Sequence, residues 1–112
     1  VCGEWTCSEP TESSYLVQLA KKYKAILVTH EHRYYGSSQP TSDWSTPNMK
    51  YLNTDQAMAD LAHFMTTLSK EFADKYSIPM KRWVIFGGSY PGALVSWFRG
   101  KFPHIALAAW SS

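Results

Sequence analysis

The sequence has no long hydrophobic run. Its most apolar stretches, such as 25–28 and 105–110, are far shorter than the roughly 20 residues that cross a bilayer. It also lacks an excess of either charge, because 11 basic and 9 acidic residues give a net charge of +2. We therefore expect no membrane span, and neither nucleic acid nor an anionic membrane surface as a partner.

Cysteine is limited to Cys2 and Cys7, in the segment Cys-Gly-Glu-Trp-Thr-Cys. This spacing matches no usual zinc pattern, so we expect no metal or other cofactor. The pair could form a small disulfide loop, bond to cysteines elsewhere, or stay reduced, and the sequence leaves all three open. The chain opens on Val1 rather than Met, with residues that resemble the end of an apolar strand, so we interpret it as a fragment of one domain.

The chain is 45% hydrophobic and 18% charged, as globular proteins are. Apolar residues at helical spacing predict a first helix beginning near Thr11, capped by Thr11 or Ser13. The continuous apolar and β-branched run 24–29 predicts a strand buried on both faces. Residues 33–52 predict a long ordered loop, whose four aromatic side chains need somewhere to pack.

The second half of the chain continues the alternation of helix and strand. A +3, +4 apolar rhythm predicts a helix over 54–75, opened by a capping box at 53–56. A buried strand is predicted at 82–86, a helix at 90–101 and a further strand at 105–110. This order favours an α/β fold of parallel strands alternating with helices, with sheet edges and apolar faces left uncovered.

Ser89 lies between the strand at 82–86 and the helix at 90–101, flanked by the glycines Gly87, Gly88 and Gly92. This pattern is typical of a nucleophile elbow, where a sharp and strained turn projects a serine hydroxyl above a sheet. Small residues are needed beside the serine because larger side chains would collide with the strand and helix. Pro91 stands where the usual second glycine would be, which a helix's first turn tolerates.

The helix behind Ser89 would place its unpaired N–H groups and positive dipole end near developing negative charge. The N–H of Tyr90, the next residue, is therefore a candidate oxyanion donor. The alternative is a glycine-rich turn in which the Ser89 hydroxyl merely caps the helix.

Four blocks extend this interpretation: Glu31-His32-Arg33-Tyr34-Tyr35-Gly36-x-Ser38-x-Pro40, Tyr51-Leu52-x-x-x-Gln56-Ala57-x-Ala59-Asp60, Phe86-Gly87-Gly88-Ser89-Tyr90 and Trp97-Phe98-Arg99-x-Lys101-Phe102-Pro103-His104. In residues and order they resemble the lysosomal prolyl carboxypeptidase family, which includes dipeptidyl peptidase II and thymus-specific serine protease. The resemblance implies an α/β-hydrolase with a Ser-Asp-His triad that cleaves peptides, often next to proline. It also implies a secreted, vesicular or lysosomal location and a homodimer.

The same resemblance makes Cys2-Gly3-Glu4 the loop that supplies the second oxyanion N–H, from Gly3 or Glu4. Residues 1–112 would then be the central part of the catalytic domain, from this oxyanion loop to the strand after the nucleophile helix. The cap domain would lie outside them. Glu4 as an ordinary surface carboxylate is the alternative.

The acid and base of a triad are not evident, because no Asp or Glu follows Ser89 and the only later histidine is His104. We expect His104 to be structural, and the 112 residues alone to be inactive as a peptidase. An esterase or lipase of the same fold, or an inactive homologue kept for binding, are the rival functions.

Four other residues could be mistaken for site residues. His30 and His32 lack further metal ligands, so we expect them to pack and hydrogen-bond around Arg33. Arg33 would pair with a buried carboxylate or orient its loop, with a surface position as the alternative. Asp60 is expected to be a helix-surface or capping group.

Overall fold

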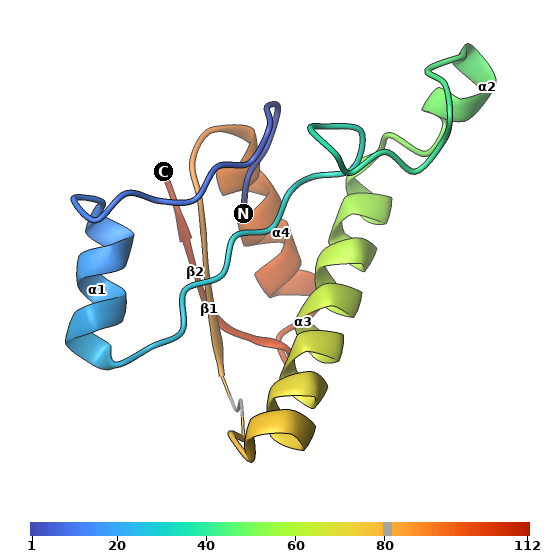
Figure 1. Cartoon of the computed structure of the whole chain (residues 1–112). Coiled ribbons are helices and arrows are strands. Elements are labelled where there is room, and N and C mark those ends of the chain that lie inside the picture. The colour runs from blue at the N-terminus through green and yellow to red at the C-terminus, as the bar shows by residue number, and fades with distance from the viewer. Residues whose placement is uncertain (80–81) are drawn as a thin grey trace.

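The protein folds as an α/β unit with two parallel strands and four helices in the described part of the chain, residues 1–79 and 82–112 of this computed structural model. The elements follow the order α1 (Tyr15–Tyr23), α2 (Thr46–Met49), α3 (Thr54–Tyr76), β1 (Trp83–Gly87), α4 (Tyr90–Lys101) and β2 (Ala106–Ser111). In Figure 1, α1 lies on one side of the strands and α3 on the other, with α4 between the strands and α3.

The centre of the molecule is the βαβ unit β1–α4–β2. The strands pair in parallel, with Phe86 opposite Trp110 and Gly87 opposite Ser111. α4 packs on both strands, as a crossover helix does. The two strands and the helix predicted for this region are confirmed, each strand beginning and ending one residue later than expected.

The strand predicted at 24–29 is wrong, because the structure assigns no strand there. The segment runs along the molecule with Ile26 and Leu27 exposed. A strand requires a neighbour along its length. In the described part of the chain, the backbone N–H groups of Lys24 and Ala25 donate back to α1, and the bond from Cys2 N to His30 O at 2.9 Å lies just past the run. The segment 24–29 has the apolar composition of a strand, but no neighbouring strand among the described residues pairs with its backbone.

α1 begins at Tyr15, four residues later than the sequence predicted. Its N-cap is Ser14, whose side chain makes no capping hydrogen bond. The expected caps were wrong, because the Thr11 and Ser13 hydroxyls hydrogen-bond to each other at 3.1 Å. No residue of α1 is fully buried.

α3 and the loop before it match the expectation only in part. The helix is confirmed within one residue of its predicted end, and the Asn53 side chain accepts a hydrogen bond from Gln56 N at 2.9 Å. In the loop Tyr34 is buried, but Trp44 is 68% exposed. The loop therefore packs less tightly than its aromatic content predicted. It extends beyond the top of α3 and includes the short helix α2 (Figure 1).

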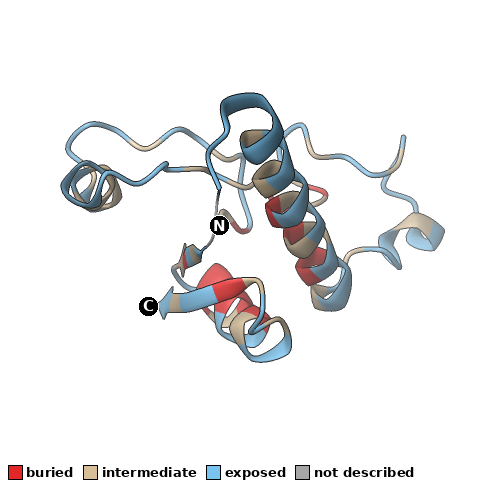
Figure 2. Cartoon of the chain, turned by 90° about the horizontal axis from the view of Figure 1, so that it is seen from below, coloured by how far each residue is buried: buried red, intermediate tan, exposed pale blue. Residues whose placement is uncertain are grey.

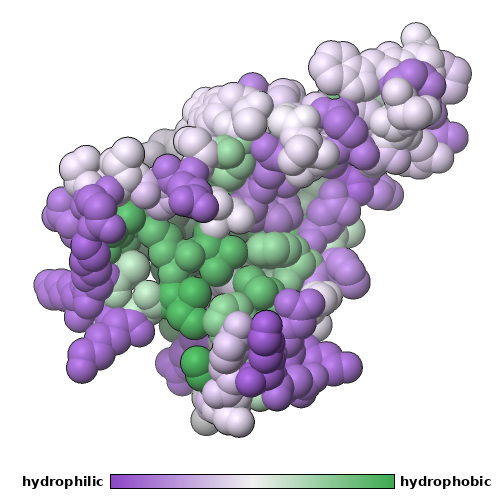
Figure 3. Space-filling model, in the orientation of Figure 1, coloured by the Kyte–Doolittle hydropathy of each residue, from purple (hydrophilic) through white to green (hydrophobic). Residues whose placement is uncertain are grey.

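The core lies between α3, α4 and one face of the strands, and Figure 2 shows the buried positions gathered mainly on these two helices. Its buried members are Ala57, Met58, Leu61, Met65, Ile85, Leu94, Val95, Phe98 and Ala106. The other face of the strands is open, with Val84 48% and Trp110 58% exposed. Figure 3 shows the apolar surface between α1 and α3. None of the described helices is long and apolar enough to span a membrane.

Candidate active site

The junction between β1 and α4 is a two-residue turn. β1 ends at Gly87 and α4 begins at Tyr90, so only Gly88 and Ser89 connect them. Ser89 has φ 59° and ψ −131°, a region that L-residues with side chains rarely occupy. The residue is exposed. The geometry is that of a strained serine at a sheet-to-helix turn, which the elbow interpretation requires.

Backbone hydrogen bonds hold this strained conformation in place. Ser89 N donates to Ser112 O at 2.7 Å, and Ser112 N donates to Gly87 O at 3.2 Å. The carbonyl of Ser89 accepts from Ala93 N at 3.2 Å, the first hydrogen bond of α4. Strain of about 1–3 kcal/mol persists only when the surroundings determine the backbone in this way. The end of β2 therefore secures the turn.

The Ser89 hydroxyl makes no capping hydrogen bond to α4. A serine whose role is to cap a helix normally accepts from an N–H of the first turn. The capping alternative therefore lacks the contact that would support it, and the hydroxyl stays available for a reacting group.

The elbow glycines are not equivalent. A Cβ on Gly87 would lie 2.2 Å from Pro91 O, and one on Gly92 would lie 2.8 Å from Ser112 O. Both contacts are with backbone atoms, which cannot move without displacing the turn. A Cβ on Gly88 would be 3.4 Å from the Ser112 hydroxyl, an ordinary contact. The fold thus requires glycine at positions 87 and 92 but not at 88.

The loop from Cys2 to Cys7 packs against the start of α4. The two cysteines form a disulfide, which resolves the alternatives that the sequence left open. Gly3 is buried, and a Cβ there would lie 2.3 Å from Pro91 Cγ. Of the two candidate donors on this loop, Gly3 therefore lies against the elbow, whereas Glu4 is exposed.

Glu31 ties the disulfide loop to the segment that follows it. Its Oε1 accepts from Cys7 N at 2.9 Å, and its Oε2 accepts from the backbone N–H groups of Ser37 and Ser38 at 3.0 and 3.1 Å. The Ser38 hydroxyl donates to the same Oε2 at 2.7 Å. These contacts favour the carboxylate, so the hydrogen bond from Cys7, followed by that from the Ser38 side chain, lowers the pKa of Glu31.

Replacing Glu31 by glutamine should destabilise the protein, because both oxygens of Glu31 accept hydrogen bonds and an amide would turn one of them into a donor. Because the pKa of Glu31 is lowered in the folded state, the carboxylate's contribution to stability is fully present above its ordinary pKa of 4.5. That contribution is lost as the pH falls through the folded pKa. Urea unfolding of the complete protein should show a large difference from wild type at pH 7 that shrinks in acid.

The matched control is Glu71→Gln on the exposed surface of α3, which takes no part in the ion pairs found among the described residues. It should leave the urea midpoint nearly unchanged at both pH values. An unfolding midpoint for Glu31→Gln equal to that of wild type at pH 7 would contradict the assigned role.

Arg33 fastens the same segment to α3. Its Nε donates to Asp60 Oδ2 at 2.6 Å and its Nη2 donates to Asp60 Oδ1 at 2.7 Å, a two-pronged ion pair. Its Nη1 donates to Tyr51 O at 2.9 Å. The expected pairing with a carboxylate is confirmed, but the carboxylate is not the buried one expected, since the Asp60 side chain is 40% exposed. The sequence had predicted Asp60 to be only a helix-surface or capping group.

His104 and His30 have surroundings of their own. His104 follows the far end of α4, which at 12 residues is about 18 Å long, and its ring is near Phe102. The His30 ring packs on Phe64 at 5.0 Å between centroids, and burial lowers the pKa of His30 to about 4. Among the described residues, no group of three or more His, Cys, Asp or Glu side chains is placed to hold a metal.

A contact that the sequence analysis did not find involves His32, which is buried and hydrogen-bonds through Nε2 to the Tyr90 hydroxyl at 2.8 Å. The two residues are 58 positions apart, and no local spacing rule connects them. The sequence offered only the expectation that His32 would hydrogen-bond within its own loop.

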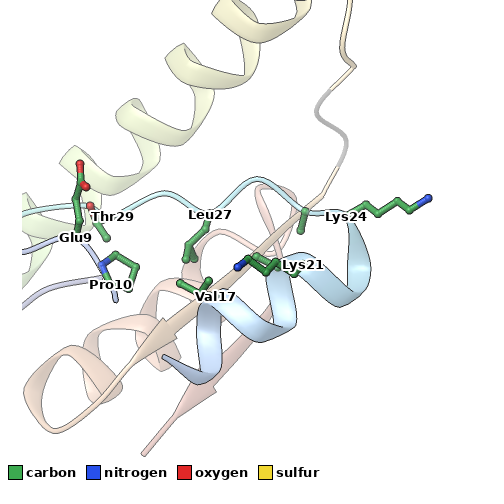
Figure 4. Close-up of a pocket in the computed structure, with 9 residues that line it drawn as sticks. Glu9, Pro10, Val17, Lys21, Lys24, Leu27 and Thr29 are labelled. Carbon is green, nitrogen blue, oxygen red and sulfur yellow. The ribbon is translucent and has the colours of Figure 1, made fainter. Parts of the chain in front are cut away.

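A pocket of about 470 Å³ lies away from the elbow, between α1 and the segment 25–29. Val17 and Leu27 face each other across it, whereas the Lys24 amine extends outwards (Figure 4). Ser89 does not line it. The pocket lies where the predicted strand 24–29 lacks neighbours, so we assign it no part in the candidate site.

Comparison with known proteins connects these observations to one family. The model of the family “Serine carboxypeptidase S28” matches residues 1–112. The Arabidopsis thaliana protein named “Probable serine protease EDA2” is 42% identical over 116 residues, which cover 100% of this chain and 24% of that protein. “Lysosomal Pro-X carboxypeptidase” of Homo sapiens is 36% identical over 108 residues, covering 94% of this chain and 21% of its own length.

A fungal relative, “Probable extracellular serine carboxypeptidase” of Arthroderma benhamiae, is 40% identical over 99 residues, which cover 87% of this chain and 14% of that protein. The chain thus spans about a quarter or less of the length of these three relatives. The similarity extends over the disulfide loop, the 31–38 segment and the elbow alike, since the family model covers every described residue.

Proposed function

The chain belongs to the serine carboxypeptidase S28 family, and from this premise we propose that the protein is a serine-type exopeptidase whose nucleophile is Ser89. The observation that carries the proposal is the strained φ of 59° at an exposed serine between β1 and α4, with its hydroxyl free of any capping bond. A fold does not determine chemistry, but a strained serine between a strand and a helix N-terminus is the arrangement that a nucleophile elbow requires, and it supports the proposal.

The proposed reaction is acyl transfer. The Ser89 Oγ forms a bond to the peptide carbonyl carbon while its proton passes to a histidine, and that histidine then protonates the amine as the C–N bond breaks. Water hydrolyses the resulting acyl-enzyme and restores the serine. We place the aspartate that orients the histidine outside residues 1–112, because no Asp or Glu follows Ser89 here, and the histidine as well, because the later His104 lies past the far end of α4.

The negative oxygen of the tetrahedral intermediate would be stabilised by two backbone N–H groups. Tyr90 supplies one as the first residue of α4, where the helix dipole adds positive potential. Gly3 supplies the other in preference to Glu4, because Gly3 is buried against Pro91 of the same turn. Gly87 and Gly92 let strand and helix approach closely enough to form the site.

We further propose that residues 1–112 form the central part of an α/β-hydrolase catalytic domain and that the substrate is a peptide cleaved next to proline. The relative named a Pro-X carboxypeptidase supports this specificity. A secreted or lysosomal location is supported by the names of two relatives and by the Cys2–Cys7 disulfide, which an oxidising compartment preserves. The homodimer implied by the family resemblance stays a prediction.

Hydrolysis by the complete protein should be measured on two chromogenic proline peptides and on a short acyl ester. One peptide reports cleavage at the amino end of the substrate and the other cleavage at its carboxyl end. We expect turnover of one of the proline peptides. Turnover of the ester alone would overturn the peptidase assignment in favour of an esterase of the same fold. No turnover of any of the three, in a folded and secreted protein, would favour an inactive binding homologue.

A further inference from the structure

The inference begins with the buried side chain of His32, which is 2% exposed. Its Nδ1 is 2.7 Å from the carbonyl oxygen of Arg33, and its Nε2 is 2.8 Å from the Tyr90 hydroxyl. A carbonyl oxygen can only accept a hydrogen bond, so Nδ1 carries the proton. In the neutral ring Nε2 is then the acceptor, and the Tyr90 O–H donates to it.

We infer that His32 is a positioning residue for the oxyanion site, holding Tyr90 so that the Ser89–Tyr90 peptide keeps its direction. This inference rests on the proposed function. Tyr90 directly follows the nucleophile and is the first residue of α4, so its side chain is the nearest side-chain anchor on the helix side of the turn. The imidazole ring meets the Tyr90 ring edge-on at 5.5 Å between centroids, which restricts the tyrosine further.

His32 can act as an anchor because its neighbours on both sides are fixed. Glu31 binds Cys7 N of the disulfide loop at 2.9 Å, and Arg33 binds Asp60 of α3 through two hydrogen bonds. Three consecutive side chains thus connect one segment to three separate parts of the molecule. The connection to α3 fixes the segment against the core.

The same segment therefore supports both candidate oxyanion donors. Glu31 holds the loop that carries Gly3, and His32 holds Tyr90. Gly3 and Pro91 are in direct contact, so the two supported parts meet beside Ser89. A shared support of this kind keeps two N–H groups aimed at one oxygen, which is the geometric condition for oxyanion stabilisation.

Loosening an oxyanion donor should lower kcat, because the oxyanion forms only after the serine attacks the substrate. Removing an oxyanion donor outright lowers kcat by about 100- to 1000-fold, and loosening a donor that remains should cost less, about 10- to 100-fold. The substrate carbonyl carries little negative charge before attack, so KM should change little. A peptide boronic acid, which forms a tetrahedral adduct with the serine, should lose affinity by the same factor as kcat/KM.

The test uses the complete protein and compares Tyr90→Phe with Tyr35→Phe. Tyr35 also lies edge-on to the His32 ring at 5.5 Å, but the bond from a tyrosine hydroxyl to that ring comes from Tyr90. Tyr90→Phe should lower kcat and boronate affinity about 10- to 100-fold with KM within about twofold of wild type. Tyr35→Phe should leave all three constants near the wild-type values.

Substitutions of His32 provide the second arm. His32→Leu should reproduce the kinetics of Tyr90→Phe, and the double variant should be no slower than either single variant, because both remove one interaction. His32→Gln, whose carbonyl oxygen can still accept from Tyr90, should recover part of kcat. Additive losses in the double variant would overturn the inference.

The kinetics of Tyr90→Phe decide the inference even if His32→Leu fails to fold. Wild-type kcat in Tyr90→Phe, or a loss confined to KM, would overturn it while the proposed function stands, provided that Ser89→Ala is inactive. If Ser89→Ala keeps the wild-type activity, the proposed function itself fails, so the two failures can be told apart.

Discussion

Replacing Ser89 by alanine in the complete protein should lower kcat for peptide hydrolysis by about 10⁵-fold or more. A serine hydrolase without its nucleophile retains only the contribution of the oxyanion site and of substrate binding. The substitution deletes a single oxygen that makes no capping bond to α4, so the fold should persist. Hydrolysis rates and circular dichroism spectra of the two proteins measure both expectations.

The matched control for this loss is Ser96→Ala, at an exposed serine of α4 seven residues further on. It should keep the wild-type kcat. Ser89→Ala with more than about a tenth of the wild-type kcat would contradict the assignment of the nucleophile.

The strain at Ser89 adds a second expectation at the same position. Glycine adopts positive φ without penalty, so Ser89→Gly should raise the free energy of unfolding by about 1 kcal/mol after the entropy cost of glycine is deducted. The same variant should be inactive. A gain in stability accompanied by loss of activity is the behaviour expected of strain kept for function.

Gly87→Ala should destabilise the protein by about 3 kcal/mol or more and abolish activity. The added Cβ would meet Pro91 O at 2.2 Å, and this backbone atom belongs to the first turn of α4. Relieving the clash means moving helix and strand apart, a cost at the upper end of overpacked substitutions. Urea unfolding and peptide hydrolysis measure the two effects.

Gly88→Ala is the natural control because it adds the same methyl group one residue later. Its Cβ would have its nearest neighbour, the Ser112 hydroxyl, at 3.4 Å, so the free energy of unfolding should change by less than about 1 kcal/mol. Equal destabilisation by the two substitutions would show that the turn does not have the close strand–helix approach described here.

The elbow, α3 and α4 could be predicted from sequence because their determinants are local, whereas α1 begins four residues later than expected and α2 lies within the expected loop. A buried strand, small residues at a turn and an apolar stripe at helical spacing all fall within a few residues of one another. The βαβ unit around Ser89 therefore appears where the sequence predicted it, with strand boundaries shifted by one residue.

The missing strand at 24–29 and the partners of Arg33 and His32 depend on contacts that the sequence does not encode locally. The run 24–29 has the composition of a strand, but a strand exists only through its neighbours, and the backbone hydrogen bonds described for this run lead back to α1. The pairing of Arg33 with Asp60 and of His32 with Tyr90 joins residues 27 and 58 positions apart. Residue type indicated that such partners were needed, while only the fold determined which ones they are.

The most direct test of the central claim is to treat the folded, complete protein with a fluorophosphonate and to locate the adduct by mass spectrometry of its peptides. Ser89 should carry the only adduct, because the residue is exposed, its backbone is strained and it lies at the start of α4. An active protein that is labelled on another residue, or that stays unlabelled, would contradict the assignment.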